Sequence, residues 1–258
     1  MRALWAVYKR EVGVFFRSPI AYAIAFGLLL FLGVLFSASV NSAVLANQSG
    51  FSGQAITANF LVQNNLAVLT FLLFIVAPLL TMRLLSEETR EGTLEVLMTL
   101  PMGDWVFVVG KYLAVWTFYT VLLGLTFVHT YLLTSIGVLD GGVLFGAYLG
   151  AWLYGGATLA VSLIWSALSE DQIVAAFLGS ATVLVLFLAD GVAQLADTQE
   201  FTRQASDFLR ELSLQSHYQN TLLEGIIRAQ DLAYFVVLIV ASLFITTLIV
   251  SSRRWRAS

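Results

Sequence analysis

Long apolar stretches alternate with short polar segments along the whole chain. As helices, all six stretches are long enough to cross about 30 Å of hydrocarbon, and none holds an Asp, Glu, Lys or Arg. Since unpaired backbone amides cannot cross lipid, each stretch predicts a transmembrane helix. The pattern predicts an all-α integral membrane protein with one domain, residues 1–258. The six stretches are Ile20 to Val40, Leu66 to Met82, Tyr112 to Ile136, Val143 to Leu168, Ile173 to Ala189 and Leu232 to Val250.

The segment before the first stretch, residues 1–18, has the pattern of an amphipathic helix lying in the membrane interface. Its apolar residues recur at helical spacing, and Pro19 suits the first turn of the helix that follows. A cleavable signal peptide is the alternative, but no A-x-A-like site closes the first apolar stretch. The interfacial residues of interest are Trp5, Tyr8, Lys9, Arg10 and Glu11.

The distribution of positive charge predicts the orientation. Ten of the 13 lysine and arginine residues fall on the side of the membrane that holds both termini. The positive-inside rule therefore places both termini in the cytoplasm. Composition agrees with a membrane protein, because 59% of the residues are hydrophobic and only 11% are charged. With no cysteine and only His129 and His217 as imidazoles, a metal site is not expected.

Two outer connections are long. Residues 41–64 contain no charged residue and predict a polar loop between the first two helices. Residues 190–231 interleave acidic and apolar residues, which predicts one or two short amphipathic helices on the outer face. A solvated connector resting on the lipid headgroups is the alternative for this second segment.

The cytoplasmic segment 83–111, between the second and third stretches, concentrates the charges. The second helix is expected to continue past the membrane until Gly92 allows a break. Thr93 can then cap a short helix from Leu94 to Leu100, and Pro101 stops the next turn. A short helix held below the membrane by two rigid arms is a natural docking site for a soluble partner, whereas a solvated helix end is the simpler alternative.

The order of residues in this segment resembles a known family. The run Glu87-Glu88-Thr89-Arg90-Glu91-Gly92-Thr93-Leu94-Glu95, followed by Leu100-Pro101 and Gly110-Lys111-Tyr112, is similar to the signature of type-2 ABC export permeases, where it leads into the coupling helix. Two other runs resemble the gliding-motility permease (GldF-like) group. They are Tyr8-Lys9-Arg10-Glu11 with Phe16-Arg17-Ser18-Pro19, and Ser216-His217-Tyr218-Gln219-Asn220 with Glu224-Gly225-Ile226-Ile227.

The resemblance implies a permease subunit in a bacterial inner membrane. It would pair with a second permease chain, identical or related, and with two separate ATPase subunits that bind ATP and Mg. The chain itself would bind lipid but no cofactor and no nucleic acid, and its interfacial helix would brace the ATPase. The residues implied to contact the ATPase are Glu87, Glu88, Glu91, Gly92, Thr93, Leu94, Glu95 and Pro101.

The chain is not expected to hydrolyse ATP or to have catalytic residues of its own. Gly110-Lys111 is followed by Tyr112, and Trp105 stands where a phosphate-binding loop needs glycine. An intramembrane enzyme would need a catalytic pair, and no Gly-x-Ser-x-Gly or thiol is present. An ion-coupled transporter or channel, the other alternative, would need titratable groups near the membrane centre, where His129 is the main candidate.

Two features of the stretches have open interpretations. His129 is expected either to relay protons or to form a hydrogen bond with a neighbouring helix. Gly142, Gly146 and Gly150 recur at every fourth residue, which lets another backbone approach closely. That close approach would occur either within the subunit or between two permease chains.

Overall fold

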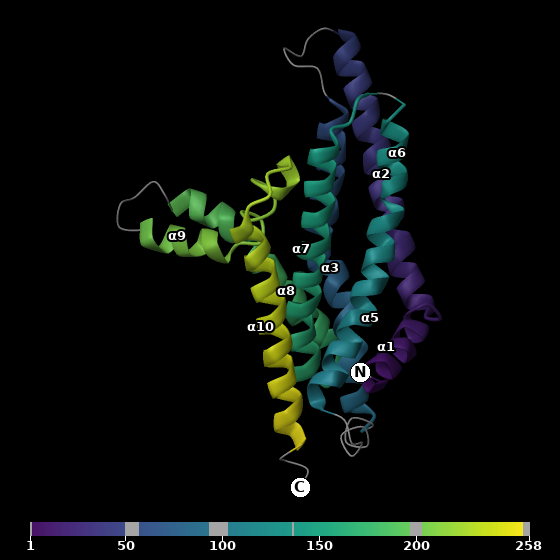
Figure 1. Ribbon diagram of the computed structural model, residues 1–258, viewed down its shortest axis with the longest axis vertical. Coiled ribbons are helices and arrows are strands. Elements are labelled where there is room, and N and C mark those ends of the chain that lie inside the picture. Colours follow the sequence, from purple (N-terminus) through teal and green to yellow (C-terminus); the bar gives the residue numbers. More distant parts are fainter. Residues whose placement is uncertain (1, 50–56, 93–102, 136, 197–202, 255–258) are drawn as a thin grey trace.

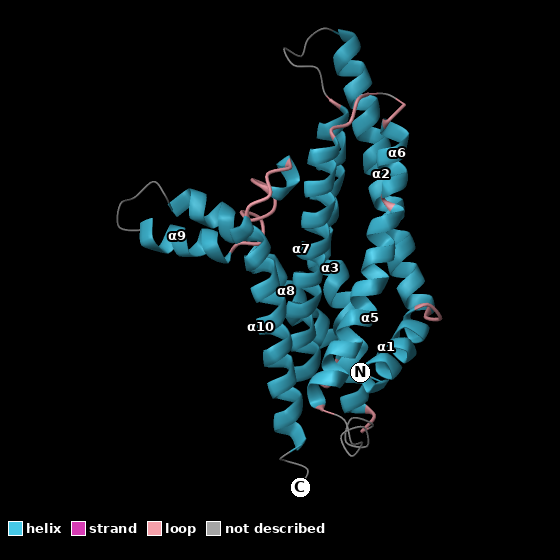
Figure 2. Cartoon of the chain, viewed as in Figure 1, coloured by secondary structure: helices cyan, strands magenta, loops and turns pink. Residues whose placement is uncertain are grey.

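The computed structural model is an elongated helical bundle with one short arm (Figure 1). It describes residues 2–49, 57–92, 103–135, 137–196 and 203–254, and within these ranges there is no strand (Figure 2). The helices are α1 (Arg2–Phe15), α2 (Pro19–Ser49), α3 (Ala58–Arg90), α5 (Asp104–Leu125), α6 (Phe127–Leu133), α7 (Gly141–Leu168), α8 (Gln172–Ala196), α9 (Arg203–Leu212), the 3-10 turn η2 (Leu222–Glu224) and α10 (Ala229–Arg254).

Six of these helical segments are long and apolar enough to cross a membrane, as the sequence predicted. They are α2, α3, α5 continued by α6, α7, α8 and α10. The N-terminal helix α1 and the C-terminal end of α10 lie at the same end of the bundle (Figure 1), as an even number of crossings requires. The expected six-helix, all-α fold is therefore confirmed.

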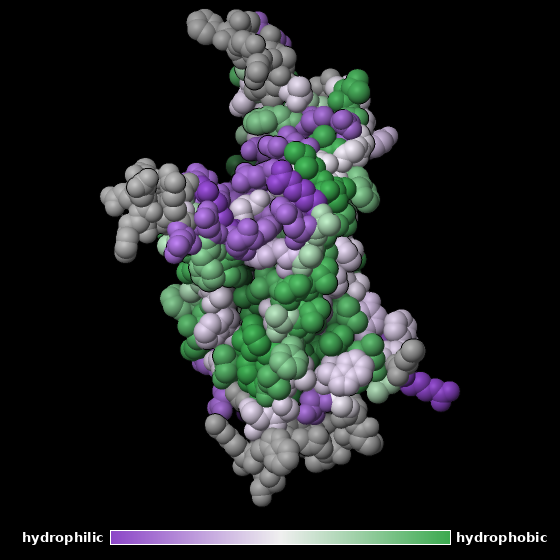
Figure 3. Space-filling view, turned by 60° about the vertical axis from the view of Figure 1, so that its left-hand side comes forward, coloured by the Kyte–Doolittle hydropathy of each residue, from purple (hydrophilic) through white to green (hydrophobic). Residues whose placement is uncertain are grey.

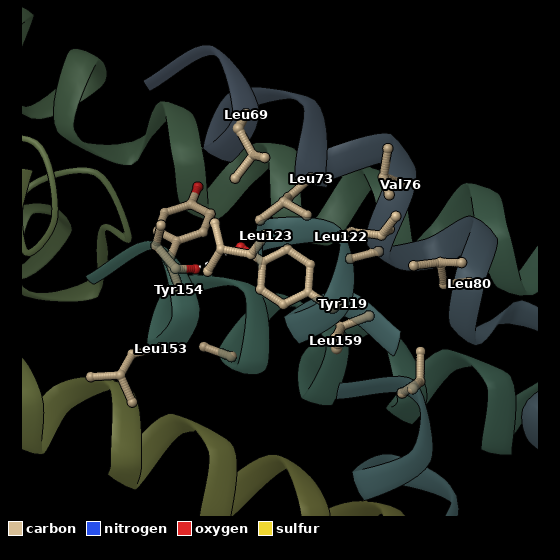
Figure 4. Packing of buried hydrophobic residues seen from close by; sticks show 14 of the residues in the cluster. Leu69, Leu73, Val76, Leu80, Tyr119, Leu122, Leu123, Leu153, Tyr154 and Leu159 are labelled. Carbon is tan, nitrogen blue, oxygen red and sulfur yellow. Dashed lines mark hydrogen bonds between the residues drawn. The ribbon is translucent and has the colours of Figure 1, made fainter. Parts of the chain in front are cut away.

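The helix α7 forms the centre of the bundle. It packs against α3, α10, α8 and α5, and 83% of its most apolar window is buried, against 17% for α2 and 28% for α8 and α10. Figure 4 shows the packing between the three inner helices, where Leu73 of α3, Tyr119 of α5 and Leu159 of α7 are all fully buried. The outer helices instead expose large apolar side chains such as Phe26 and Val237.

The exposed apolar side chains suit a lipid environment. Figure 3 shows a broad apolar surface on the bundle, below a band of polar residues at the level of α9. An apolar surface of this extent is unusual for a soluble monomer but normal for helices that face acyl chains. The apolar surface below the polar band is therefore expected to face the lipid bilayer.

The prediction of a polar loop for residues 41–64 was wrong for most of these residues. The helix α2 continues to Ser49 and α3 begins at Ala58, so that both helices extend into this segment. Short polar side chains bond to the helices themselves there: Ser42 donates to the carbonyl of Ala38 at 2.9 Å, and Thr57 caps α3 by accepting from the amide of Phe60. Absence of charge was a sign of helix extension, not of a loop.

The third crossing is interrupted, which hydropathy did not predict. The helix α5 ends at Leu125 and α6 begins at Phe127. At the break, the hydroxyl of Thr126 donates to the carbonyl of Leu123 at 2.7 Å, and a second bond at 3.3 Å joins it to Tyr148 of α7. A threonine side chain that bonds to the preceding turn competes with the regular helical pattern, while its apolar neighbours hide the break from a hydropathy count.

The glycine pattern of α7 serves packing within the subunit. A Cβ atom at Gly146 would lie 2.8 Å from the Cα of Gly225, and one at Gly150 would lie 2.8 Å from the ring of Tyr218. Both glycines therefore admit the segment around η2, which precedes α10. Gly142 has only the side chain of Asp140 near it. This geometry decides between the two interpretations for Gly146 and Gly150.

The arm between α8 and α10 contains the short helices expected for this segment, α9 and η2. Figure 1 shows α9 projecting to the side of the bundle. His217 anchors the arm: its Nδ1 lies 2.8 Å from Asp231, its Nε2 lies 3.2 Å from the carbonyl oxygen of Glu211, and its ring stacks on Tyr234. This second histidine has a structural explanation in hydrogen bonding and stacking.

Candidate functional site

Four charged side chains meet at the end of the bundle that holds both termini. This charge cluster consists of Arg10 and Glu11 from α1, Glu88 from the last turn of α3 and Lys111 from α5. The amino group of Lys111 lies 3.2 Å from the carboxylate of Glu11 and 2.9 Å from that of Glu88. Arg10 approaches the same two carboxylates, at 2.7 Å and 3.2 Å. Three helices that are distant in sequence are joined by one network.

The inner part of the charge cluster is removed from solvent. The side chain of Lys111 is 3% exposed and that of Glu11 is 6% exposed, whereas Arg10 is half exposed. The ammonium of Lys111 also lies 5.0 Å from the ring centroid of Phe107. Because two positive and two negative groups are present, the burial is balanced in charge, and loss of one inner partner would leave an uncompensated buried ion.

The helix α1 reaches the charge cluster by packing directly on α5. A Cβ atom at Gly110 would lie 2.8 Å from the side chain of Val7, so that glycine allows the two helices to touch. Further along, the hydroxyls of Tyr8 and Thr117 are 3.0 Å apart, and the ring of Phe15 stacks on Phe118. Part of the apolar face of α1 is therefore covered by α5, while Trp5 and Val14 stay exposed.

The close approach at Gly110 gives a direct test of how α1 is held. We expect Gly110→Val to displace α1 at a cost of about 1–3 kcal/mol, the usual range for overpacking. Trypsin should then cleave after Lys9 and Arg10 faster than in the wild type, in detergent solution. Gly13→Val is the matched control, because nothing lies within 4 Å of a Cβ at that position. Equal cleavage of both variants would contradict a packed α1.

The end of α3 is fixed against α7 near the same site. The hydroxyl oxygen of Ser166 in α7 accepts from the amides of Leu85 and Ser86, at 3.1 and 3.3 Å, and donates to the carbonyl of Met82 at 2.9 Å. The helix then ends at Arg90, two residues before a glycine with a φ of 68°. The break predicted at Gly92 is confirmed, and it is a left-handed turn that suits glycine.

The residues expected to contact an ATPase divide into three groups. Glu91 and Gly92 are exposed and Glu87 is partly exposed. The carboxylates of Glu87 and Glu91 line a cleft of about 500 Å³, and the charge cluster forms another part of its wall. Glu88 instead turns inward to Lys111, and its side chain is 14% exposed. The expected coupling helix, Leu94 to Leu100, lies outside the described residues, as do Thr93, Leu94, Glu95 and Pro101.

The residues singled out in α1 also have different surroundings. Trp5 and Lys9 are exposed, and Trp5 is 64% accessible. Tyr8 bonds to α5, while Arg10 and Glu11 belong to the charge cluster. The sequence thus located a helix with a charged side, but it did not reveal that Arg10 and Glu11 face α3 and α5.

A family model for an ABC-2 family transporter protein matches residues 5–252, nearly the whole chain. The chain belongs to the ABC-2 transporter family. No curated protein shows significant similarity to it. The resemblance to type-2 ABC permeases is therefore confirmed at the level of the family. The six apolar helices agree with a multi-pass membrane subunit of this ABC-2 family.

Sequence reasoning missed the role of Lys111 in this ABC-2 chain. A signal was present, because Lys111 directly precedes Tyr112, where an uncharged apolar stretch begins. A lysine at such a depth needs either a route to water or an anionic partner. The partners come from α1 and α3, and only the tertiary structure brings them together.

His129, the histidine that lies within a membrane crossing, contacts side chains of two neighbouring helices. The Nδ1 of His129 lies 3.2 Å from the side-chain nitrogen of Asn65, which can donate to it, and its ring stacks on Phe36. Among the described residues, no three His, Asp or Glu side chains are grouped so that they could hold a metal ion. The hydrogen-bonding interpretation of His129 thus has a defined partner on α3.

Proposed function

We propose that this chain is the non-catalytic permease subunit of an ABC-type exporter or envelope machine, driven by a separate ATPase. The observation that carries the proposal is the charge cluster. It joins α1 to the helices on both sides of the 93–102 segment, which is where the ATPase would dock. Force applied to that segment would act on three connected helices rather than on a single loop.

The contacts of the inner helices support transmission into the membrane. At one side of the docking segment, Ser166 holds α3 to α7. At the other side, the hydroxyl of Tyr112 in α5 donates to the carbonyl of Gly156 in α7 at 3.1 Å. Because α7 is the most buried helix, a displacement of either arm would be carried to the centre of the bundle. Nucleotide-driven closure of the ATPase would supply that displacement.

The expected assembly follows from the family resemblance. Two ATPase subunits with ATP and Mg would bind two permease chains, identical or related, and the GldF-like group is the branch that we favour. Both termini and the charge cluster would face the cytoplasm of a bacterium, since most lysine and arginine residues lie at that end. Both export of a substrate and mechanical work on the envelope are compatible with this assembly.

Association with the ATPase is the first test. The full chain, co-expressed with the ATPase of its own system, is expected to co-purify with it and to alter its rate of ATP hydrolysis. Charge reversal by Glu91→Lys at the exposed end of α3 should weaken association about tenfold or more. The carboxylate would pair with a cationic group of the ATPase, and lysine would place a like charge opposite that group. Glu224→Lys, an exposed reversal in η2 at the other end of the bundle, is the matched control.

Two results would overturn the proposal. One is an ATPase that binds wild-type and Glu91→Lys chains equally, which would remove the docking site from this end of α3. The other is solute transport in vesicles by the chain alone, without nucleotide or ATPase. That result would favour an ion-coupled transporter.

A further inference from the structure

A second groove lies beside the charge cluster and has a different composition. It has a volume of about 870 Å³ and is bounded by α1, the beginning of α2 and Arg83 of α3. Four cationic side chains line it, and none of its lining residues is acidic. Its volume is within the range of small-molecule binding sites, and its cations are Lys9, Arg10, Arg17 and Arg83.

Most of this positive charge is not neutralised within the described part of the chain. Arg10 is paired with Glu11 and Glu88 in the charge cluster. In contrast, Lys9, Arg17 and Arg83 form no ion pair with any described residue. Arg83 is only partly exposed and lines the groove, so an anion there would lower the cost of holding its charge at this position.

The N-terminus of α2 adds to the positive potential. Ser18 and Pro19, where α2 begins, form part of the groove wall. The first turn of a helix carries a partial positive charge that favours a phosphate or carboxylate. The three cations and this helix end therefore act on the same space.

The first turns of α2, which follow the groove wall at Pro19, present an apolar surface that the described part of the chain leaves uncovered. Directly after Pro19, the side chains of Ile20, Tyr22 and Phe26 are exposed, with Phe26 at 68%. The apolar surface continues along α2, whose most apolar window is 17% buried. A ligand with a negative head and apolar chains would match both surfaces at once, and a free anion would use only the first.

We propose that this groove binds the phosphate headgroup of an anionic phospholipid, whose acyl chains lie along the exposed face of α2. Lys9, Arg17 and Arg83 contact the phosphate and the headgroup oxygens. The lipid thereby joins α1 to the membrane-spanning helices and holds the charge cluster at a fixed depth. This site requires no nucleotide and no ATPase, so its test is independent of the function proposed above.

Native mass spectrometry of the full chain in detergent micelles measures this binding. Dioctanoyl phosphatidylglycerol should bind about tenfold or more tightly than dioctanoyl phosphatidylcholine, which has no net charge. At about 1 kcal/mol for each cation near the phosphate, Lys9→Gln should weaken phosphatidylglycerol binding about fivefold, and Arg17→Gln with Arg83→Gln about 25-fold. Because Lys9 is exposed, its replacement tests the site even if the double variant folds poorly.

Arg2→Gln is the matched control, since Arg2 is exposed on the same helix but does not line the groove. It should leave the affinity unchanged. Equal affinity for the two lipids, or equal weakening by Arg2→Gln and Lys9→Gln, would overturn the proposal. Either result would mean that no specific site binds the headgroup and that only the general surface charge attracts lipid. Displacement of the lipid by an excess of inorganic phosphate would assign the groove to a free anion and overturn it as well.

Discussion

Replacing Lys111 by methionine is expected to destabilise the protein by about 3–5 kcal/mol, the usual cost of removing one partner from a buried ion pair. Methionine fills a similar volume but leaves Glu11 and Glu88 without the ammonium that lies within 3.2 Å of both. Arg10 cannot compensate fully, because it is half exposed and approaches from the solvent side. Unfolding by SDS in mixed micelles measures the difference.

The control for this prediction is Lys9→Met, which removes an exposed lysine from the same region and should change stability by less than about 0.5 kcal/mol. Adding Glu11→Gln and Glu88→Gln to Lys111→Met should restore most of the lost stability, because the two carboxylates that Lys111 neutralises are then replaced by uncharged amides. If Lys111→Met alone unfolds at the wild-type SDS concentration, the charge cluster does not hold the helices together.

A single methyl group at Gly155 is expected to have the second large effect. A Cβ at this position would overlap the ring of Tyr119. That ring is fully buried, and its hydroxyl donates to the carbonyl of Ala151 at 2.7 Å. Because the ring cannot move without breaking this bond, Gly155→Ala should cost about 3 kcal/mol, the upper end of the usual overpacking range.

Gly124→Ala is the matched comparison, since it makes the same change within a helix but has nothing within 4 Å of the new Cβ. It should be neutral or slightly stabilising, by about 0.5–1 kcal/mol, because alanine is the better helix former. The same SDS unfolding experiment serves both variants. Equal stability of the two would show that α5 and α7 pack more loosely than the structure indicates.

The hydropathy pattern predicts where helices occur but not which helix is central. Both α7 and α10 are long and apolar, yet 83% of the apolar segment of α7 is buried, against 28% of the corresponding segment of α10. The difference lies in side-chain size: α7 carries small residues such as Gly146, Gly150 and Gly155 at its contacts, whereas α10 is rich in Val, Leu and Ile. Small residues allow backbones to approach, and large ones suit lipid.

The candidate site was predictable only in part, for a similar reason. A local pattern indicated that α3 ends near Gly92, because a positive φ and a helix end depend on neighbouring residues. The inward position of Glu88 depends on Lys111 and Glu11, which come from distant parts of the chain. A charge run in the sequence gives the number of charges, but only packing decides which of them meet water.

The position of the two chain ends has a practical consequence for gene architecture. The N-terminal helix and the C-terminal end of α10 lie at the same end of the bundle (Figure 1). A soluble domain joined to either end of the chain would therefore occupy the same compartment. The C-terminal end is the better point of attachment, because α1 is packed on α5 and a fused domain there would strain that contact. A soluble domain joined after α10 by a flexible linker would therefore lie beside α1 without a further membrane crossing.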